Sequence, residues 1–151
     1  MTGLYLEDYT VGRVFETEPV RLDAEEIIWF AELHDPQVFH TDPERAKESA
    51  FGEHVASGFQ SVAIATGQFI RTGAVEGTGM GGPGLDEVRW TAPVRPGESL
   101  QTRVEVIEAR ATRSNPGRGV VTLGFAVATE SGPVLTFKAT IFVRARAGEK
   151  A

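Results

Sequence analysis

The sequence predicts an α+β domain in which an antiparallel sheet wraps around one central helix. Two observations carry this prediction. Small and apolar residues dominate a helical stretch from Gly58 to about Arg71, and the apolar segments after Glu87 alternate with the period of two that strands show. With 151 residues and 41% hydrophobic content, the chain fits one domain over residues 1–151 with a sizeable core.

The first half of the chain carries two sets of helix signals. Asp23 can cap a first helix, and Pro36 ends it because a proline disfavours helical geometry at the residue before it, Asp35. Asp42, which a proline follows, predicts the start of a second, short helix. Residues 37–41 are therefore predicted to form an ordered connection between two capped helices.

The central helix is predicted to begin at Ser57, which forms a capping-box pattern with Gln60. We expect it to be buried, because small side chains would let the sheet approach its backbone closely. These small residues are Ala63, Ala65 and Gly67, and Thr72-Gly73 can end the helix. The six glycines from Gly73 to Gly84 then predict a flexible surface loop, which we expect to cover a pocket.

The remaining segments predict strands. One strand is expected near residues 13–20 and another over Glu87 to Thr91. Three further strands follow from the alternating apolar sets 100–106, 121–127 and 135–143. Turn signals at 93–97, 114–119 and 131–133 separate these strands, so we expect hairpins and a largely antiparallel sheet.

Composition excludes several classes of function. A net charge of −6 argues against binding DNA or RNA, which needs a contiguous basic surface. No apolar stretch reaches the roughly 20 residues of a membrane span, and the N-terminus lacks a signal-peptide pattern, so we expect a cytoplasmic protein. Without cysteine, catalysis must use oxygen and imidazole groups. His34 and His40 lack metal-binding spacing, so we expect no metal.

One constellation of reactive residues stands out. The segment from His34 to His40 contains Asp35 five positions before His40, and Ala56-Ser57-Gly58 opens the central helix. With Thr-Asp-Pro-Glu at 41–44 and Arg-Trp-Thr-Ala-Pro-Val-Arg-Pro-Gly-Glu-Ser-Leu at 89–100, these residues make the chain similar to the MaoC-like dehydratases and (R)-specific enoyl-CoA hydratases. The resemblance implies a hotdog fold, a homodimer or an assembly of dimers, and catalytic roles for Asp35 and His40.

Hydration of a conjugated thioester requires a base for water, a proton for the alpha carbon and stabilisation of an enolate oxygen. Asp35 and His40 converging on one water can supply the first two groups. With Ser57 as cap, the N–H of Gly58 has no intrahelical partner and can bind the enolate oxygen. We therefore predict a hydro-lyase that interconverts 2-enoyl-CoA and 3-hydroxyacyl-CoA, by the resemblance the (R) form, and that requires no cofactor.

Three further residues are predicted to bind the substrate: Ser57, Phe39 and Thr66. Ser57 has a sufficient role as a cap and lacks the strand–turn context of a hydrolase nucleophile. Thr66 could line the acyl pocket, although a hydroxyl bonded to a helix carbonyl is the commoner arrangement. The family's common motif is Asp-x-Asn-Pro-x-His, whereas this chain has Gln37 and Val38 at the middle positions.

Two other functions fit the same fold and the same acyl thioester partner. One is an acyl-CoA thioesterase, and the other is a non-catalytic acyl-CoA binding module. Incubation with crotonyl-CoA separates the three hypotheses, because the outcome is a hydration product, a free thiol or neither.

Overall fold

The computed structural model describes residues 3–148. The helices are α1 (Ala24–His34), α2 (Val38–Thr41), α3 (Pro43–Ala46) and α4 (Gly58–Arg71), with short 3-10 turns at η1 (Leu6–Asp8) and η2 (Arg146–Gly148). The strands are β1 (Val14–Glu16), β2 (Val20–Arg21), β3 (Gly84–Trp90), β4 (Ser99–Ala111), β5 (Arg118–Thr129) and β6 (Gly132–Arg144).

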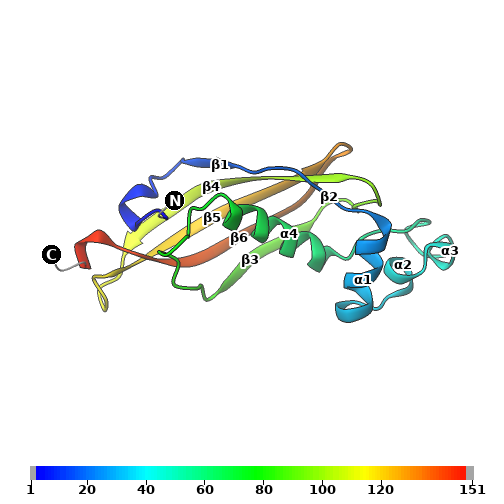
Figure 1. Cartoon of the computed structure of the whole chain (residues 1–151), viewed down its shortest axis with the longest axis horizontal. Coiled ribbons are helices and arrows are strands. Elements are labelled where there is room, and N and C mark those ends of the chain that lie inside the picture. The colour runs from blue at the N-terminus through cyan, green and yellow to red at the C-terminus, as the bar shows by residue number, and fades with distance from the viewer. Residues whose placement is uncertain (1–2, 149–151) are drawn as a thin grey trace.

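The six strands form one antiparallel sheet in the order β1-β4-β5-β6-β3, with β2 beside β4. The sheet curves around α4, while α1, α2 and α3 gather beyond one end of it (Figure 1). The alternating residues of the three long strands point toward α4 and form the core, together with Ala65 and Phe69 of the helix. The predicted architecture and the predicted inward faces of these strands are confirmed.

Two strand predictions are wrong in detail. The turn at 93–97 is not a hairpin, because β3 pairs with β6 and β4 pairs with β5, so this turn joins strands on different sides of the sheet. The strand expected at 13–20 is divided into β1 and β2. Between them, the Oγ1 of Thr17 donates to Thr102 O and accepts from Thr102 N, so a side chain replaces the backbone in the ladder.

The helix caps form at the predicted residues. Asp23 accepts a hydrogen bond from Glu26 N, and Asp42 accepts from the first turn of α3. The connection at 37–41 is not a simple loop, because it closes one helical turn, α2. Ser57 caps α4 through Phe59 N, and the capping box is not completed. The Gln60 side chain instead donates to Glu26 O of α1.

Helix α4 is buried on one face only, which corrects the expectation of a fully buried helix. Ala65 is completely buried, whereas Ala63 is exposed. Phe59 and Ile70 are 61% and 52% exposed. The sheet covers the face of α4 that carries Ala65. No other part of residues 3–148 covers the opposite face of the helix.

The glycine-rich segment 73–84 is held along the end of β6. Met80 N donates to Phe142 O, and Phe142 N donates to Gly81 O, at 2.8 and 2.7 Å. These bonds replace the flexible loop that the glycines predicted with an ordered segment. As expected, the segment lines a pocket, whose volume is about 440 Å³.

A buried polar cluster ties α4 to the sheet. The Gln68 side chain is 3% exposed, and its amide donates to Leu100 O and Glu18 O at 2.8 Å. Its carbonyl oxygen accepts from Thr102 Oγ1 at 2.7 Å. All three bonds connect the last turn of α4 to the edge where β2 meets β4, so Gln68 fixes the position of α4 along the sheet.

Replacement of Gln68 by alanine should therefore destabilise the protein. Two backbone carbonyls and a hydroxyl would lose partners in the interior, and we expect a loss of about 3 kcal/mol in the free energy of unfolding, measured in urea. Gln101→Ala is the matched control, because Gln101 also bonds to a backbone carbonyl but is exposed. Equal losses in the two variants would contradict this assignment.

Candidate active site

The structure brings Asp35 and His40 together at the end of α1. Asp35 is the C-cap residue of α1, and His40 lies in the single turn of α2. The Nε2 of His40 is 3.2 Å from Oδ2 of Asp35. Both side chains are largely buried, with exposed fractions of 6% for His40 and 13% for Asp35. The predicted pair is thus in direct contact.

The His40 ring is held by the backbone behind it. Its Nδ1 is 2.7 Å from the carbonyl oxygen of Val55, which can only accept, so Nδ1 must carry a hydrogen. In the neutral ring Nε2 then holds the lone pair, and it faces Asp35. The buried His54 ring supports the same turn, with its Nε2 2.6 Å from His40 O. Proton exchange at His40 is therefore confined to the nitrogen that faces Asp35.

Two further donors bind the Asp35 carboxylate. Gln37 Nε2 donates to Oδ1 and Ser57 Oγ donates to Oδ2, both at 2.8 Å. Burial by itself raises the pKa of Asp35, but the bonds from Gln37 and Ser57, with the charge and hydrogen bond of His40, outweigh it and hold that pKa below its ordinary value. The arrangement favours an ionised carboxylate.

The N-terminus of α4 faces the same pocket. Gly58, its first residue, lines the pocket, and the hydrogen bonds found among residues 3–148 include none donated by its N–H. The indole ring of Trp90 lies against the Cα of Gly58 where a side chain would otherwise stand. Glycine is therefore required here for packing against Trp90, a reason that the sequence alone did not reveal.

The pocket has a volume of about 300 Å³ and is mainly apolar. Asp35, His40 and Gly58 share it with the predicted Phe39, whose ring packs edge-on against His40 with 4.5 Å between centroids. Phe59 and Trp90, also in an edge-on contact, form another part of the wall. The sequence analysis did not assign these two aromatic residues to the site: Trp90 comes from a strand distant in the chain, and no local pattern shows that Phe59, next to Gly58, faces the pocket.

Two predicted substrate-binding residues lie elsewhere. Ser57 is completely buried and its hydroxyl bonds to Asp35, so it supports the carboxylate from behind the pocket. Thr66 lines the separate pocket beneath the 73–84 segment, and its Oγ1 donates to Val62 O at 2.9 Å. The helix-carbonyl arrangement considered for Thr66 is the one that forms.

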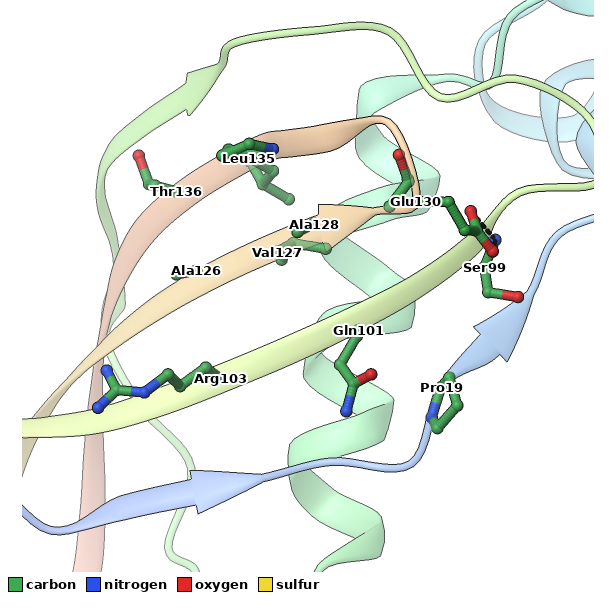
Figure 2. Close-up of a pocket in the computed structure, with 12 residues that line it drawn as sticks. Pro19, Ser99, Gln101, Arg103, Ala126, Val127, Ala128, Glu130, Leu135 and Thr136 are labelled. Carbon is green, nitrogen blue, oxygen red and sulfur yellow. Dashed lines mark hydrogen bonds between the residues drawn. The ribbon is translucent and has the colours of Figure 1, made fainter.

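A larger hollow, of about 700 Å³, lies on the face of the sheet turned away from α4 (Figure 2). Its floor includes Ala126 and Ala128, and Gln101 and Arg103 of β4 stand along one side. None of the six predicted site residues lines it. The largest of these hollows is therefore not the one that holds the predicted residues, and the contact between Asp35 and His40 makes the smaller pocket the candidate site.

The family model for the MaoC like domain matches residues 8–128 of this chain. The chain belongs to the MaoC-like family. This is a family of dehydratases and hydratases, and the resemblance seen in the sequence is confirmed. The sheet wrapped around α4 is its hotdog fold.

Individual MaoC-like relatives agree with this assignment. The crystal structure of the MaoC-like dehydratase from Rhodospirillum rubrum superposes with a TM-score of 0.88 at 34% identity, over 95% of this chain and 99% of that one. The uncharacterized protein YdeM of Bacillus subtilis is 32% identical over 74% of this chain and 79% of its own length. The 3-hydroxyacyl-thioester dehydratase Z of Mycobacterium tuberculosis is 31% identical over 63% of this chain and 64% of its own.

Within residues 3–148 of this MaoC-like chain, no helix has the length and apolar character needed to cross a bilayer.

Replacement of Gln37 by methionine should raise the pKa of Asp35. Methionine has a similar shape but cannot donate to Oδ1, so the ionised form loses one of its hydrogen bonds. The hydrogen bonds to the Asp35 carboxylate stabilise the folded protein fully at pH values above the ordinary carboxyl pKa. This stabilisation is lost as the pH falls through the lowered pKa that Asp35 has in the folded protein. Wild type and variant should therefore differ in stability near neutral pH and converge in acid.

The pKa of Asp35 can be measured by carbon-13 NMR of its carboxyl group across a pH titration. The Gln101→Met variant is the control, because it removes an exposed glutamine near the start of β4 that does not line the pocket of Asp35. An unchanged Asp35 titration in Gln37→Met would refute the role of the Gln37 bond.

Proposed function

We propose that this chain hydrates 2-enoyl thioesters, and removes water from 3-hydroxyacyl thioesters in reverse, with an acyl-CoA as substrate. The observation that carries this proposal is the contact between Asp35 and His40 beside the N–H of Gly58, in one apolar pocket. This set provides a base, an acid and an oxyanion donor without any nucleophile.

The geometry suggests how the proton moves. The Nδ1–H of His40 donates to Val55 O, so an added proton is carried by Nε2. The Nε2–H then donates to the Asp35 carboxylate. Asp35 then accepts a proton from water as the water oxygen bonds to the beta carbon. His40 Nε2–H gives its proton to the alpha carbon. The proton on Asp35 can return to Nε2 across the 3.2 Å contact, which restores the pair.

The thioester carbonyl gains negative charge when the beta carbon is attacked. The free N–H of Gly58 at the positive end of the α4 dipole is suited to that oxygen. Phe39, Phe59 and Trp90 exclude water around it and offer an apolar surface to the acyl group. From the resemblance to the (R)-specific hydratases, we propose the (R) product.

The two alternative functions can be compared with the same pocket. A thioesterase that used Ser57 as its nucleophile would need this residue exposed to the thioester, but it is buried with its hydroxyl on Asp35. A thioesterase in which Asp35 activates water for attack on the carbonyl carbon would use the same pair, and release of free thiol from crotonyl-CoA distinguishes it from the hydratase. A binding module would have no use for a carboxylate held ionised beside an imidazole, an arrangement typical of acid–base catalysis.

The Asp35→Asn and His40→Gln variants test the proposal. Each keeps the shape of the side chain but removes its acid–base function, and each should lower hydration of crotonyl-CoA by at least about 100-fold. The double variant should be little worse than either single one, because the two groups act on one water. Glu48→Gln, at an exposed carboxylate outside the pocket, is the control. Variants that fold normally and retain wild-type rates would exclude the assigned roles.

We also propose that the active protein is a homodimer or an assembly of dimers. Strand β3 is the end strand of the sheet. Leu85 and Trp90 of β3 are 46% and 47% exposed, and the uncovered face of α4 adds Phe59 and Ile70. The exposed apolar side chains of this end strand, beside the exposed apolar side chains of α4, make a surface that a second copy would bury.

Analytical ultracentrifugation at micromolar concentration should therefore give at least a dimeric mass. Leu85→Lys places a charge on the exposed edge and should shift the protein to monomer. Val11→Lys, at a residue that is 70% exposed in a turn, should leave the mass unchanged. A monomeric wild type would contradict the dimer.

A further inference from the structure

A further hollow lies at the hairpin that joins β4 to β5. This hairpin is at the opposite end of the sheet from α1, α2 and α3 (Figure 1). The hollow is shallow, with a volume of about 620 Å³, and we name it the arginine hollow. Its lining includes Arg110, Arg113, Ser114, Arg118 and Phe142. It shares no residue with the pocket that contains Asp35 and His40.

The charge of this hollow differs from that of the whole chain. Three guanidinium groups line it, and no carboxylate is among its lining residues, all of which fall within 3–148. The chain as a whole has a net charge of −6, so this positive cluster is not the general character of the surface. Arg110 is 3.5 Å from Glu108, but both side chains are about 60% exposed, and such a pair is weak.

The environment of Arg118 combines one favourable contact with two unfavourable features. Its guanidinium lies 4.5 Å from the centre of the Phe142 ring, while its Nε is buried without a hydrogen-bond partner. Arg144 lies directly opposite it on β6, and like charges in that position destabilise a sheet. A bound anion would offset the like-charge repulsion, because it would neutralise charge from Arg118 and its neighbours at once.

The loop that carries Arg113 and Ser114 is ordered by its own bonds. Thr112 Oγ1 lies 2.6 Å from Asn115 O and 3.0 Å from Arg118 O, and Asn115 Oδ1 accepts from Gly117 N at 3.0 Å. The backbone of the hairpin is therefore set before any ligand arrives, which lowers the entropy lost on binding.

From these observations we propose that the arginine hollow binds a phosphate group. Guanidinium groups present paired N–H donors that match two phosphate oxygens, and the hydroxyl of Ser114 adds a neutral donor. A phosphate dianion carries two charges and can neutralise two arginines at once, whereas a carboxylate carries only one charge. The group can come from a nucleotide-type ligand or from free phosphate. The inference is independent of the function proposed for Asp35 and His40.

Isothermal titration calorimetry of the full chain at low ionic strength tests the site, with inorganic phosphate and adenosine 3′,5′-bisphosphate as separate ligands. Saturable 1:1 binding that weakens as salt is added is expected. Arg118→Gln and Arg113→Gln should each weaken binding about tenfold, the usual effect of losing one charge-assisted bond. Arg113 is exposed on the hairpin, so its variant keeps the test valid if Arg118→Gln fails to fold.

Arg103→Gln is the control, because it removes one arginine charge from the first half of β4, at a residue that does not line the arginine hollow. Much tighter binding of the bisphosphate identifies a nucleotide-type ligand, and equal affinities identify free phosphate. Two results would overturn the proposal: no saturable binding of either ligand, or equal weakening by Arg103→Gln and Arg113→Gln.

Discussion

The hydrogen bond from Ser57 Oγ to Asp35 Oδ2 is the interaction on which the site depends. It joins the C-terminal end of α1 to the N-terminal end of α4, two helices that are separated by more than twenty residues in the chain. The same serine caps α4, so the group that fixes the helix start also orients the carboxylate. Through this one side chain, the position of α4 on the sheet determines where Asp35 lies.

Other hydrogen bonds also connect the site to the position of α4. Gln68 fixes α4 along the sheet, and Gln60 ties its first turn to the backbone of α1. Val55, just before α4, supplies the carbonyl that sets the His40 ring. Asp35 and His40 sit on a short connection, but buried groups from outside it, Val55 O and the Ser57 hydroxyl, hold their side chains. A site held in this way can be mostly apolar and still keep a carboxylate ionised.

Local signals in the sequence predicted much of this structure. The caps at Asp23, Asp42 and Ser57, the end of α1 at Asp35 and the inward faces of the long strands all depend on neighbouring residues. Long-range pairing could not be predicted in this way. Nothing near 93–97 shows that β3 crosses to β6, because strand partners are chosen by the whole sheet.

The site was predictable to a similar extent. The spacing of Asp35 and His40 places them on one short segment, whereas Ser57 reaches Asp35 only through tertiary folding. Thr66 lies eight residues into α4, about 12 Å along the axis from Gly58 at 1.5 Å per residue, which is enough to place it in another pocket. Trp90 faces Gly58 from a distant strand, and no local pattern pairs them.

The central claim is that this pocket adds water to an enoyl thioester and does not cleave or merely hold it. The most direct measurement is incubation of the wild-type protein with crotonyl-CoA in oxygen-18 water, followed by mass spectrometry and chiral analysis. The account predicts 3-hydroxybutyryl-CoA of (R) configuration with one oxygen-18 at the hydroxyl and no release of free CoA. Release of CoA with labelled crotonate, or recovery of unchanged crotonyl-CoA, would contradict it.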